Sequence, residues 1–307
     1  MKAIGIRDSN HMRDFTVMEI PIPELDDDEA LVRIRAVGVG IHDRWALPPN
    51  PRFPFAIGLE GAGTVEKVGS GVVGFGPGDR VMFSSMPQAK GGTWAEFTAV
   101  PANLLIGIPD DLEFTEAAAL PIAGTTALEG IKALSLAHGS TVFIAGASGA
   151  IGTLAIQLAT QRGYRIAASA STINHEYMTS LGAEQAVDYR DAHWVQHVLD
   201  WMPQGVDAAL AIQPGTGTAS LPVVRNGGKI VTISGDQVIP ERGIQVEQIT
   251  HHPETRQEIS QLAADVAAGR MRVVIDRAYP FEEGLRALEQ SATRHARGKI
   301  ILTLADH

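Results

Sequence analysis

Residues 140–163, which read STVFIAGASGAIGTLAIQLATQRG, constrain the fold more than any other part of this sequence. The run 141–145 is mostly apolar and rich in β-branched residues, as in a buried parallel strand. Three glycines follow at every third position, Gly146, Gly149 and Gly152. A helical apolar pattern begins at Ala150, between the last two of them. A glycine turn between a strand and a helix lets backbone N–H groups and the positive end of the helix approach a pyrophosphate. The stretch therefore predicts a loop that holds a phosphate group.

This glycine pattern is weak evidence by itself, because glycines also form purely structural turns and Ala147 replaces the first glycine of G-x-G-x-x-G. The surrounding sequence strengthens the interpretation. Strand-like runs follow, with helical patterns between them, at 164–170, 186–188, 206–212 and 229–234. Such alternation predicts a doubly wound parallel sheet, whose ligands bind at the carboxyl ends of the strands. We therefore predict a Rossmann dinucleotide-binding domain over 119–245.

Composition excludes several classes of function. The 307 residues are enough for two domains, and 45% hydrophobic with 20% charged residues is ordinary for a soluble protein. The net charge of −10 argues against a nucleic acid or an anionic membrane as partner. The absence of cysteine excludes disulfides, thiolate zinc ligands and a cysteine nucleophile. Because the sequence shows no signal peptide and no membrane-spanning apolar segment, we expect a cytoplasmic protein.

The first third of the chain has a different pattern. Short alternating runs, separated by Gly and Pro turns, lie at 15–20, 30–39, 63–68, 80–83 and 95–100. Many short strands with such turns predict an all-β, partly open barrel. The last segment departs from the βαβ rhythm, with helices expected at 254–268 and 282–290 and strands at 272–276 and 299–304. We expect it to return to the first module, so that one domain comprises 1–118 and 246–307.

A series of short motifs runs along nearly the whole chain in a fixed order. They are Gly58-Leu59-Glu60-Gly61-Ala62-Gly63, Gly78-Asp79-Arg80-Val81, Gly91-Gly92-Thr93-Trp94-Ala95-Glu96, Ala119-Leu120-Pro121 with Gly124-Thr125-Thr126-Ala127, Gly146 to Gly152, Leu181-Gly182-Ala183 with Asp188-Tyr189-Arg190, Asn226-Gly227-Gly228 and Gly298-Lys299-Ile300. The series resembles the medium-chain dehydrogenase/reductase superfamily and, within it, the zinc-independent quinone oxidoreductases. The resemblance implies an α/β fold in which a GroES-like, partly open β-barrel catalytic domain accompanies a Rossmann coenzyme domain with a doubly wound parallel sheet.

The residues present argue against zinc. In the zinc alcohol dehydrogenases of this superfamily a cysteine and a histidine bind the catalytic metal, and Gly40 and Leu59 stand at the positions that resemble theirs. Neither side chain can ligate zinc, so we expect no metal. His193 and His197 lie four apart and would share a helical face, as a metal pair could. We interpret them instead as a surface or packing pair, because the sequence places no third ligand.

Without zinc, the oxidation of an alcohol loses the Lewis acid that stabilises an alkoxide. The resemblance instead implies an enzyme that transfers hydride from NADPH to a quinone or an α,β-unsaturated carbonyl, whose delocalised product needs only hydrogen bonds and a proton. The alternative is a non-catalytic NADPH-binding sensor or structural relative, because Gly40 replaces the asparagine of many relatives. Relatives commonly form homodimers through edge strands, and the corresponding edge here is 238–246, unless Pro240 and Gly243 break it.

The residues at the end of the second strand of the predicted sheet determine whether NAD or NADP fits. A carboxylate about 20 residues after the glycines would hold the ribose 2′-OH of NAD and repel a 2′-phosphate. No acid lies within 168–172, so the sequence favours NADPH over NADH. The resemblance places Ser171, His175 and Tyr189 around the 2′-phosphate, with Arg190 as a nearby cation. The alternatives are a helix N-cap for Ser171, packing for Tyr189 and solvated surface for the other two.

The resemblance also assigns the remaining site residues. It implies that the pyrophosphate is bound by Ser148, Gly149, Ala150 and Ile151. It implies that the nicotinamide is bound by Thr126, Ile212, Ser234 and Gly235. Around the acceptor it implies Gly40, Trp45 and Leu59. His42 or Asp43 is the candidate for supplying a proton or a hydrogen bond, and the alternatives are an incidental loop histidine and a helix-capping aspartate.

Overall fold

The computed structural model describes residues 1–10, 12, 14–85, 88–252 and 254–305, and the chain divides into two compact units. Unit 1 comprises Met1–Ile122 and Ile259–His307, and unit 2 comprises Ala123–Glu258. The sequence places the corresponding boundaries after residues 118 and 245. The second boundary lies later in the structure because strand β14 (Gln245–Gln248) pairs with the sheet of unit 2.

Unit 2 is built on one sheet of six strands, all paired in parallel. The strands are β9 (Thr141–Ala145), β10 (Arg165–Ser169), β11 (Gln185–Val187), β12 (Val206–Ala211), β13 (Val224–Thr232) and β14. Their spatial order is β11-β10-β9-β12-β13-β14, so the strand order reverses between β9 and β12. The predicted doubly wound sheet is therefore confirmed.

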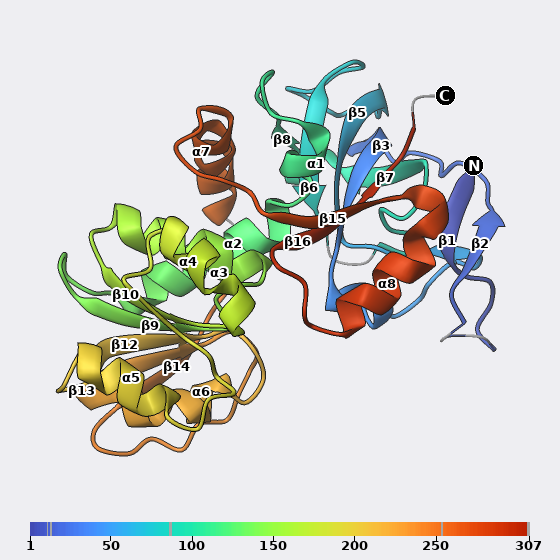
Figure 1. The fold of residues 1–307 in the computed structure, drawn as a ribbon. Helices are drawn as coiled ribbons and strands as arrows, with labels where there is room; N and C mark the ends of the chain where they lie inside the picture. Colours follow the sequence, from blue (N-terminus) through green and yellow to red (C-terminus); the bar gives the residue numbers. More distant parts are fainter. Residues whose placement is uncertain (11, 13, 86–87, 253, 306–307) are drawn as a thin grey trace. The chain divides into compact units, whose positions relative to one another are not determined.

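Helices cover both faces of this sheet. Figure 1 shows α2 (Pro121–Leu134), α3 (Ala150–Gln161) and α4 (His175–Ser180) on one side, and α5 (Trp194–Trp201) and α6 (Thr216–Ser220) on the other. The alternation of side chains along each strand explains the two layers. Phe143 of β9 stacks on Trp194 of α5, with ring centroids 5.4 Å apart. On the opposite face Leu210 of β12 packs at Gly130 of α2.

The predicted edge strand over 238–246 is wrong for most of its length. Strand β14 begins only at Gln245 and takes the edge position beside β13. The preceding residues turn instead, because Pro240 cannot donate a backbone hydrogen bond and both Arg242 and Gly243 have positive φ. The alternative of a broken edge is the one that the structure supports.

Unit 1 is mainly β. A seven-stranded sheet has the order β15-β16-β3-β5-β6-β8, with β7 also paired to β3, and a three-stranded sheet has the order β2-β1-β4. The strands are β1 (Lys2–Ile6), β2 (Thr16–Glu19), β3 (Glu29–Val39), β4 (Phe55–Ala56), β5 (Glu60–Val68), β6 (Arg80–Ser84), β7 (Phe97–Pro101), β8 (Ile106–Gly107), β15 (Ile275–Pro280) and β16 (Lys299–Thr303). The core between them contains large buried side chains, among them Trp94, Phe55 and Phe83.

The C-terminal segment returns to this first module, as the sequence predicts, because β16 pairs antiparallel with β3. Its helices are α7 (Thr255–Ala267), which begins before the boundary at Ile259, and α8 (Gly284–Ala292). Unit 1 also contains the short α1 (Phe114–Ala117). The strand predicted at 272–276 is wrong in position, since β15 begins only at Ile275. Pairing with β16 fixes this register, and β15 buries only Tyr279 among exposed neighbours, which leaves no apolar run to detect.

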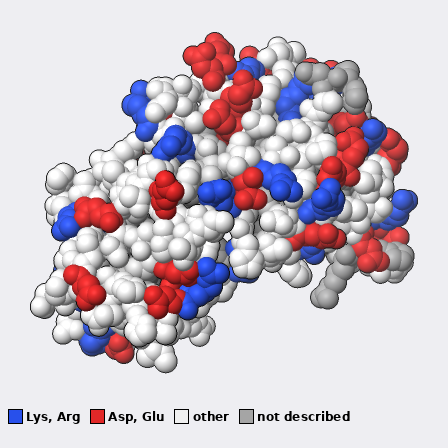
Figure 2. All heavy atoms as spheres, in the orientation of Figure 1, with Lys and Arg blue, Asp and Glu red and all other residues white. Residues whose placement is uncertain are grey.

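The surface carries charges of both signs. Figure 2 shows Lys and Arg interspersed with Asp and Glu over the face that it draws. Among the described residues, no helix combines the length and the apolar character needed to cross a bilayer.

Candidate coenzyme and acceptor sites

The three glycines after β9 are needed for different reasons. Gly146 has φ of +83°, and a Cβ there would lie 2.9 Å from Cγ of Gln213. A Cβ on Gly152 would lie 2.5 Å from the Ala147 Cα, so this glycine lets the helix pack against its own turn. Both positions therefore need glycine for the fold alone.

Gly149 differs, because the protein itself gives no steric reason for a glycine there. A Cβ at Gly149 would approach only the Gly146 carbonyl oxygen, at 3.8 Å, and φ is −78°. Gly149 is the N-cap residue of α3, and no side chain caps this helix end. The missing side chain leaves the N-terminus of a 12-residue helix open to an anion. This cradle fits the pyrophosphate of a dinucleotide, and its residues Ser148, Gly149, Ala150 and Ile151 are all half-buried.

Residues from the neighbouring strand ends lie around this turn. The Ile212 backbone N–H follows β12 and donates to the Ala145 carbonyl at 3.1 Å, which brings Ile212 beside the glycine turn. Ser234 and Gly235 follow β13 and are exposed. Thr126 lies on α2 and is buried. Of these four predicted nicotinamide residues, the structure joins Ile212 directly to the turn.

The predicted 2′-phosphate residues gather at the ends of β10 and β11. Ser171 is the N-cap residue of the 3₁₀ helix η3 (Thr172–Asn174), but its Oγ caps no backbone N–H and instead accepts from Asn174 Nδ2 at 3.2 Å. His175 Nε2 lies 3.2 Å from the Ala170 carbonyl oxygen. Tyr189 is 51% exposed, which argues against a packing role. Arg190 is exposed and bound to an acid.

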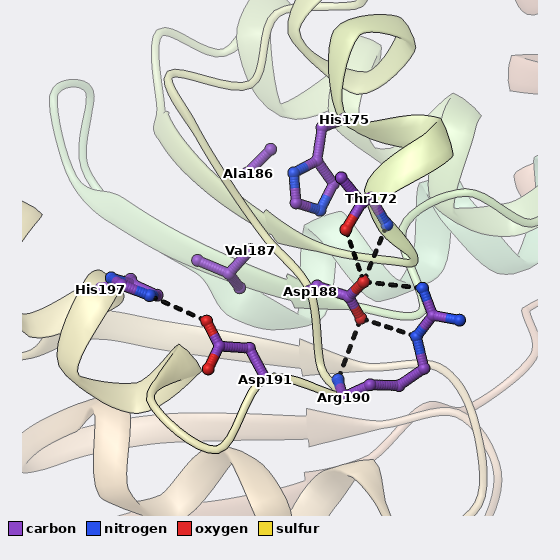
Figure 3. A pocket seen from close by; sticks show the side chains of 8 residues that line it. All are labelled: Thr172, His175, Ala186, Val187, Asp188, Arg190, Asp191 and His197. Carbon is purple, nitrogen blue, oxygen red and sulfur yellow. Dashed lines mark hydrogen bonds and ion pairs between the residues drawn. The ribbon is translucent and has the colours of Figure 1, made fainter.

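That acid is Asp188, which the sequence analysis did not recognise as a site residue. Its Oδ2 accepts from the Thr172 backbone N–H at 3.0 Å and from Thr172 Oγ1 at 2.7 Å. Arg190 Nη2 donates to the same oxygen at 2.7 Å (Figure 3). Hydrogen bonds from Arg190 and Thr172 hold the pKa of Asp188 well below its usual range. The parallel pairing of Ser169 with Val187 was the missing information, because it brings an acid after β11 to the end of β10.

Asp188, Thr172 and Arg190 line a pocket of about 480 Å³, to which Ser171 and Tyr189 do not contribute. It is lined by Thr172, His175, Ala186, Val187, Asp188, Arg190, Asp191 and His197 (Figure 3). His197 Nε2 lies 3.0 Å from Asp191 Oδ2, and His193 Nδ1 lies 3.4 Å from Asp191 Oδ1. The two histidines thus contact a shared acid at the surface. Within the described ranges, no group of three or more His, Asp or Glu is arranged to hold a metal ion.

A second histidine contact fixes a buried carboxylate of unit 2. Glu129 on α2 is 4% exposed and lies 2.5 Å from His251 Nδ1. It also accepts from the His252 backbone N–H at 2.8 Å and from Thr255 Oγ1 at 3.1 Å. His251 and His252 therefore supply hydrogen-bond partners to a buried acid.

In unit 1 the predicted acceptor residues Gly40, Asp43 and Leu59 come together at one carboxyl group. Asp43 is 3% exposed, and its Oδ2 accepts from the Gly40 backbone N–H at 2.8 Å. Burial raises the pKa of Asp43 to about 7, although hydrogen bonds from the Gly40 and Leu59 backbones and the charge of Lys299 oppose this shift. Asp43 is the third residue of the short 3₁₀ helix η1 (Ile41–Arg44), so it caps that helix from within.

A buried ion pair lies near this carboxyl group, and sequence reasoning missed it. Glu60 and Lys299 bind each other with side chains 1% and 8% exposed. Glu60 Oε2 also accepts from the Ile122 backbone N–H at 2.8 Å. The available signal was a charged residue at the first position of each strand, beside a glycine, since Glu60 begins β5 and Lys299 begins β16.

The other two predicted acceptor residues lie on the surface of unit 1. His42 is exposed and Trp45 is 65% exposed, and the Trp45 backbone N–H donates to the His42 carbonyl at 2.9 Å. A Cβ at Gly40 would have no atom within 4 Å. The glycine thus leaves open space in front of the loop that carries these residues.

Comparison with known proteins identifies the family. Residues 26–110 match the alcohol dehydrogenase GroES-like domain, and residues 181–302 match a family described as zinc-binding dehydrogenase. A 2-methylene-furan-3-one reductase of Solanum lycopersicum is 30% identical over 298 residues, which cover 92% of this chain and 74% of the relative. The chain belongs to the medium-chain dehydrogenase/reductase superfamily, in its quinone oxidoreductase-like branch.

Other relatives cover nearly the whole chain. A quinone oxidoreductase of Sus scrofa is 28% identical over 305 residues, which cover 93% of this chain and 91% of the relative. The solved structure of the quinone oxidoreductase from Coxiella burnetii superposes with a TM-score of 0.87 at 26% identity and covers 99% of both chains. The predicted fold, with a GroES-like domain and a Rossmann domain, is confirmed.

Proposed function

We propose that this chain is an NADPH-dependent oxidoreductase that reduces a quinone or an α,β-unsaturated carbonyl without zinc. The observation that carries the proposal is the open N-terminus of α3 at the point where the strand order reverses, where Gly149 has no steric reason within the protein. The names of relatives support the choice of reaction, since they include a quinone oxidoreductase and an NADPH-dependent alkenal/one oxidoreductase of Arabidopsis thaliana.

The coenzyme, when bound, supplies a hydride from its nicotinamide ring. We propose that Ser148, Gly149, Ala150 and Ile151 hold its pyrophosphate through backbone N–H groups and the positive end of α3. The nicotinamide is assigned to Thr126, Ile212, Ser234 and Gly235. The adenosine 2′-phosphate is assigned to Ser171, His175, Tyr189 and Arg190.

The acceptor is assigned to Gly40, Trp45 and Leu59. The resemblance to the zinc alcohol dehydrogenases places Gly40 and Leu59 where those enzymes have zinc ligands. Neither side chain carries a ligand atom, so we propose a reaction that uses hydrogen bonds and a proton instead of a Lewis acid. Because its pKa is raised to about 7, Asp43 holds a proton near neutral pH while an ordinary aspartate does not. We assign it as the proton store, and the exposed His42 beside it as the group that exchanges protons with water.

A homodimer is part of the proposal, and we place it in the cytoplasm with no nucleic-acid or membrane partner. Among the residues that the structure describes, the edge strand β14 pairs only with β13, which leaves its other side for a second copy. Light scattering on the purified chain measures this state directly. A monomer at micromolar concentration would contradict this part.

The test of the function is a fluorescence titration with NADPH and NADH, followed by oxidation of the bound coenzyme with 9,10-phenanthrenequinone and a panel of enones. Binding with turnover of at least one acceptor is expected, in protein that metal analysis shows to be free of zinc. Absence of coenzyme binding would overturn the proposal.

A second function is favoured by one observation, the 3% exposure of Asp43 together with glycine at position 40. A shielded carboxyl group and a missing polar side chain would suit a protein that binds NADPH and does not reduce an acceptor. Binding without turnover across the panel would select this non-catalytic sensor over the reductase.

A further inference from the structure

Strand pairing brings an acid to the carboxyl end of β10, where a dinucleotide-binding domain distinguishes NAD from NADP. Ser169 of β10 pairs with Val187 of β11, and the Ala170 backbone N–H donates to the Val187 carbonyl at 3.1 Å. Asp188, the next residue, therefore lies at the carboxyl end of β10 although it belongs to the following strand. No acid follows β10 in the sequence, but Asp188 at the end of the neighbouring strand β11 takes that place.

Five hydrogen bonds fix the carboxylate of Asp188 (Figure 3). Two come from Thr172, and three come from the backbone N–H, Nε and Nη2 of Arg190, at 3.0, 3.0 and 2.7 Å. A carboxylate offers about four lone-pair sites, so these donors occupy its capacity. Asp188 is therefore not free to accept a ribose 2′-OH, and its remaining influence is its negative charge.

The same pairing engages the cation that a 2′-phosphate would need. Arg190 presents two side-chain donors to Asp188, which is the bidentate geometry that it would otherwise offer to a phosphate. The Asp188 side chain is 15% exposed and that of Arg190 is 60% exposed, so the carboxylate is shielded while the guanidinium that it holds lies at the surface. Asp191 adds a second carboxylate to the same pocket, paired with His197.

We propose that Asp188 is a specificity-determining residue, which limits the preference for the 2′-phosphorylated coenzyme through its charge and by withholding Arg190. The proposal rests on the coenzyme binding proposed above and names the group that sets its selectivity. The unmodified chain then prefers NADPH over NADH less than its 2′-phosphate residues would otherwise allow. Removal of this one charge creates a strong preference for the phosphorylated form.

The test uses ADP-ribose and 2′-phospho-ADP-ribose, which lack the nicotinamide and so report binding without reaction. Isothermal titration of Asp188→Asn is expected to tighten 2′-phospho-ADP-ribose at least about tenfold and to leave ADP-ribose within about twofold, the size expected for one charge at a site open to water. Asp191→Asn is the matched control, because it removes one negative charge from the same pocket without freeing Arg190. It is expected to change the ratio of the two dissociation constants by less than about threefold.

Arg190→Ala is then introduced into the unmodified chain and into Asp188→Asn. It should weaken 2′-phospho-ADP-ribose much more in Asp188→Asn, where the guanidinium is free, and Asp188→Ser repeats the test if the asparagine variant does not fold. Equal changes for both ligands, a control that matches Asp188→Asn, or a loss confined to ADP-ribose would each overturn the assignment. If neither ligand binds the unmodified chain at millimolar concentration, both the proposed coenzyme function and the role of Asp188 are refuted. If both ligands bind and Asp188→Asn leaves the ratio of their dissociation constants unchanged, only the role of Asp188 is refuted.

Discussion

The two units each hold a carboxyl group at a candidate site, and the two groups have opposite protonation chemistry. Asp43 in unit 1 is buried, and burial raises its pKa to about 7. Asp188 in unit 2 is bound to Arg190 and Thr172, whose hydrogen bonds lower its pKa. The difference shows that a carboxyl group becomes a proton donor or a fixed charge according to its partners. Asp43 suits proton storage, and Asp188 suits electrostatic selection of a ligand.

The largest loss of stability is expected from breaking the buried ion pair of Glu60 with Lys299, which lies near Asp43. Lys299→Met leaves the Glu60 carboxylate buried without its cation, and should lower the free energy of unfolding by about 3–5 kcal/mol. The double variant Glu60→Gln/Lys299→Met should recover most of this loss, because no unpaired charge then remains. Urea unfolding followed by circular dichroism measures both. A loss below about 1 kcal/mol in the single variant would show that the pair is hydrated.

The next effect is a pH dependence with a defined sign. Because the pKa of folded Asp43 is about 7 against an ordinary 3.8, its contribution to stability is present below pH 3.8 and is lost as pH rises toward 7. Relative to Asp43→Asn, the unmodified chain should lose up to about 1.4 kcal/mol of unfolding free energy per pH unit across that window.

Urea unfolding of the two proteins at pH 5, 6 and 8 measures this difference. Asp188→Asn serves as the control, since a lowered pKa gives stability that is lost only as pH falls below the ordinary value. Parallel pH profiles for Asp43→Asn and the unmodified chain would show that the pKa of Asp43 is not raised.

The smallest effect on stability is expected at Asp188 itself. Its ion pair with Arg190 lies at the surface, where water and salt screen the attraction. Asp188→Asn should therefore shift Tm by less than about 3 °C at 0.15 M salt, although it changes coenzyme selection. Differential scanning calorimetry measures the shift. A much larger change would mean that the pair holds β10 and β11 together, and that its role is structural.

Sequence patterns predicted the parts of the fold that depend on local order. The apolar run 141–145 coincides with β9, and the glycine turn leads into α3 as expected. The parallel sheet followed because strands and helices alternate between Tyr164 and Ser234. Strand β15 was misplaced, because only Tyr279 among its residues is buried and its position depends on pairing with β16.

The candidate sites were predicted less completely, because their chemistry depends on contacts between distant residues. Asp43 was a candidate, but nothing in the sequence indicated that it is buried. The nearby ion pair of Glu60 with Lys299 joins segments that are more than two hundred residues apart. Asp188 escaped notice because an acid was sought after β10 and not after the strand beside it. Register between neighbouring strands is the physical information that one sequence does not contain.

Hydride transfer to a conjugated acceptor can be followed with NADPH that carries deuterium at both C4 positions of the nicotinamide, so that the transferred hydride is labelled whichever face reacts. The unmodified chain is incubated with this coenzyme and an enone, and the product is examined by NMR. Deuterium at the β-carbon and a solvent proton at the α-carbon are expected, with the proton step slowed in Asp43→Asn. Bound coenzyme with no labelled product across the acceptor panel would contradict it.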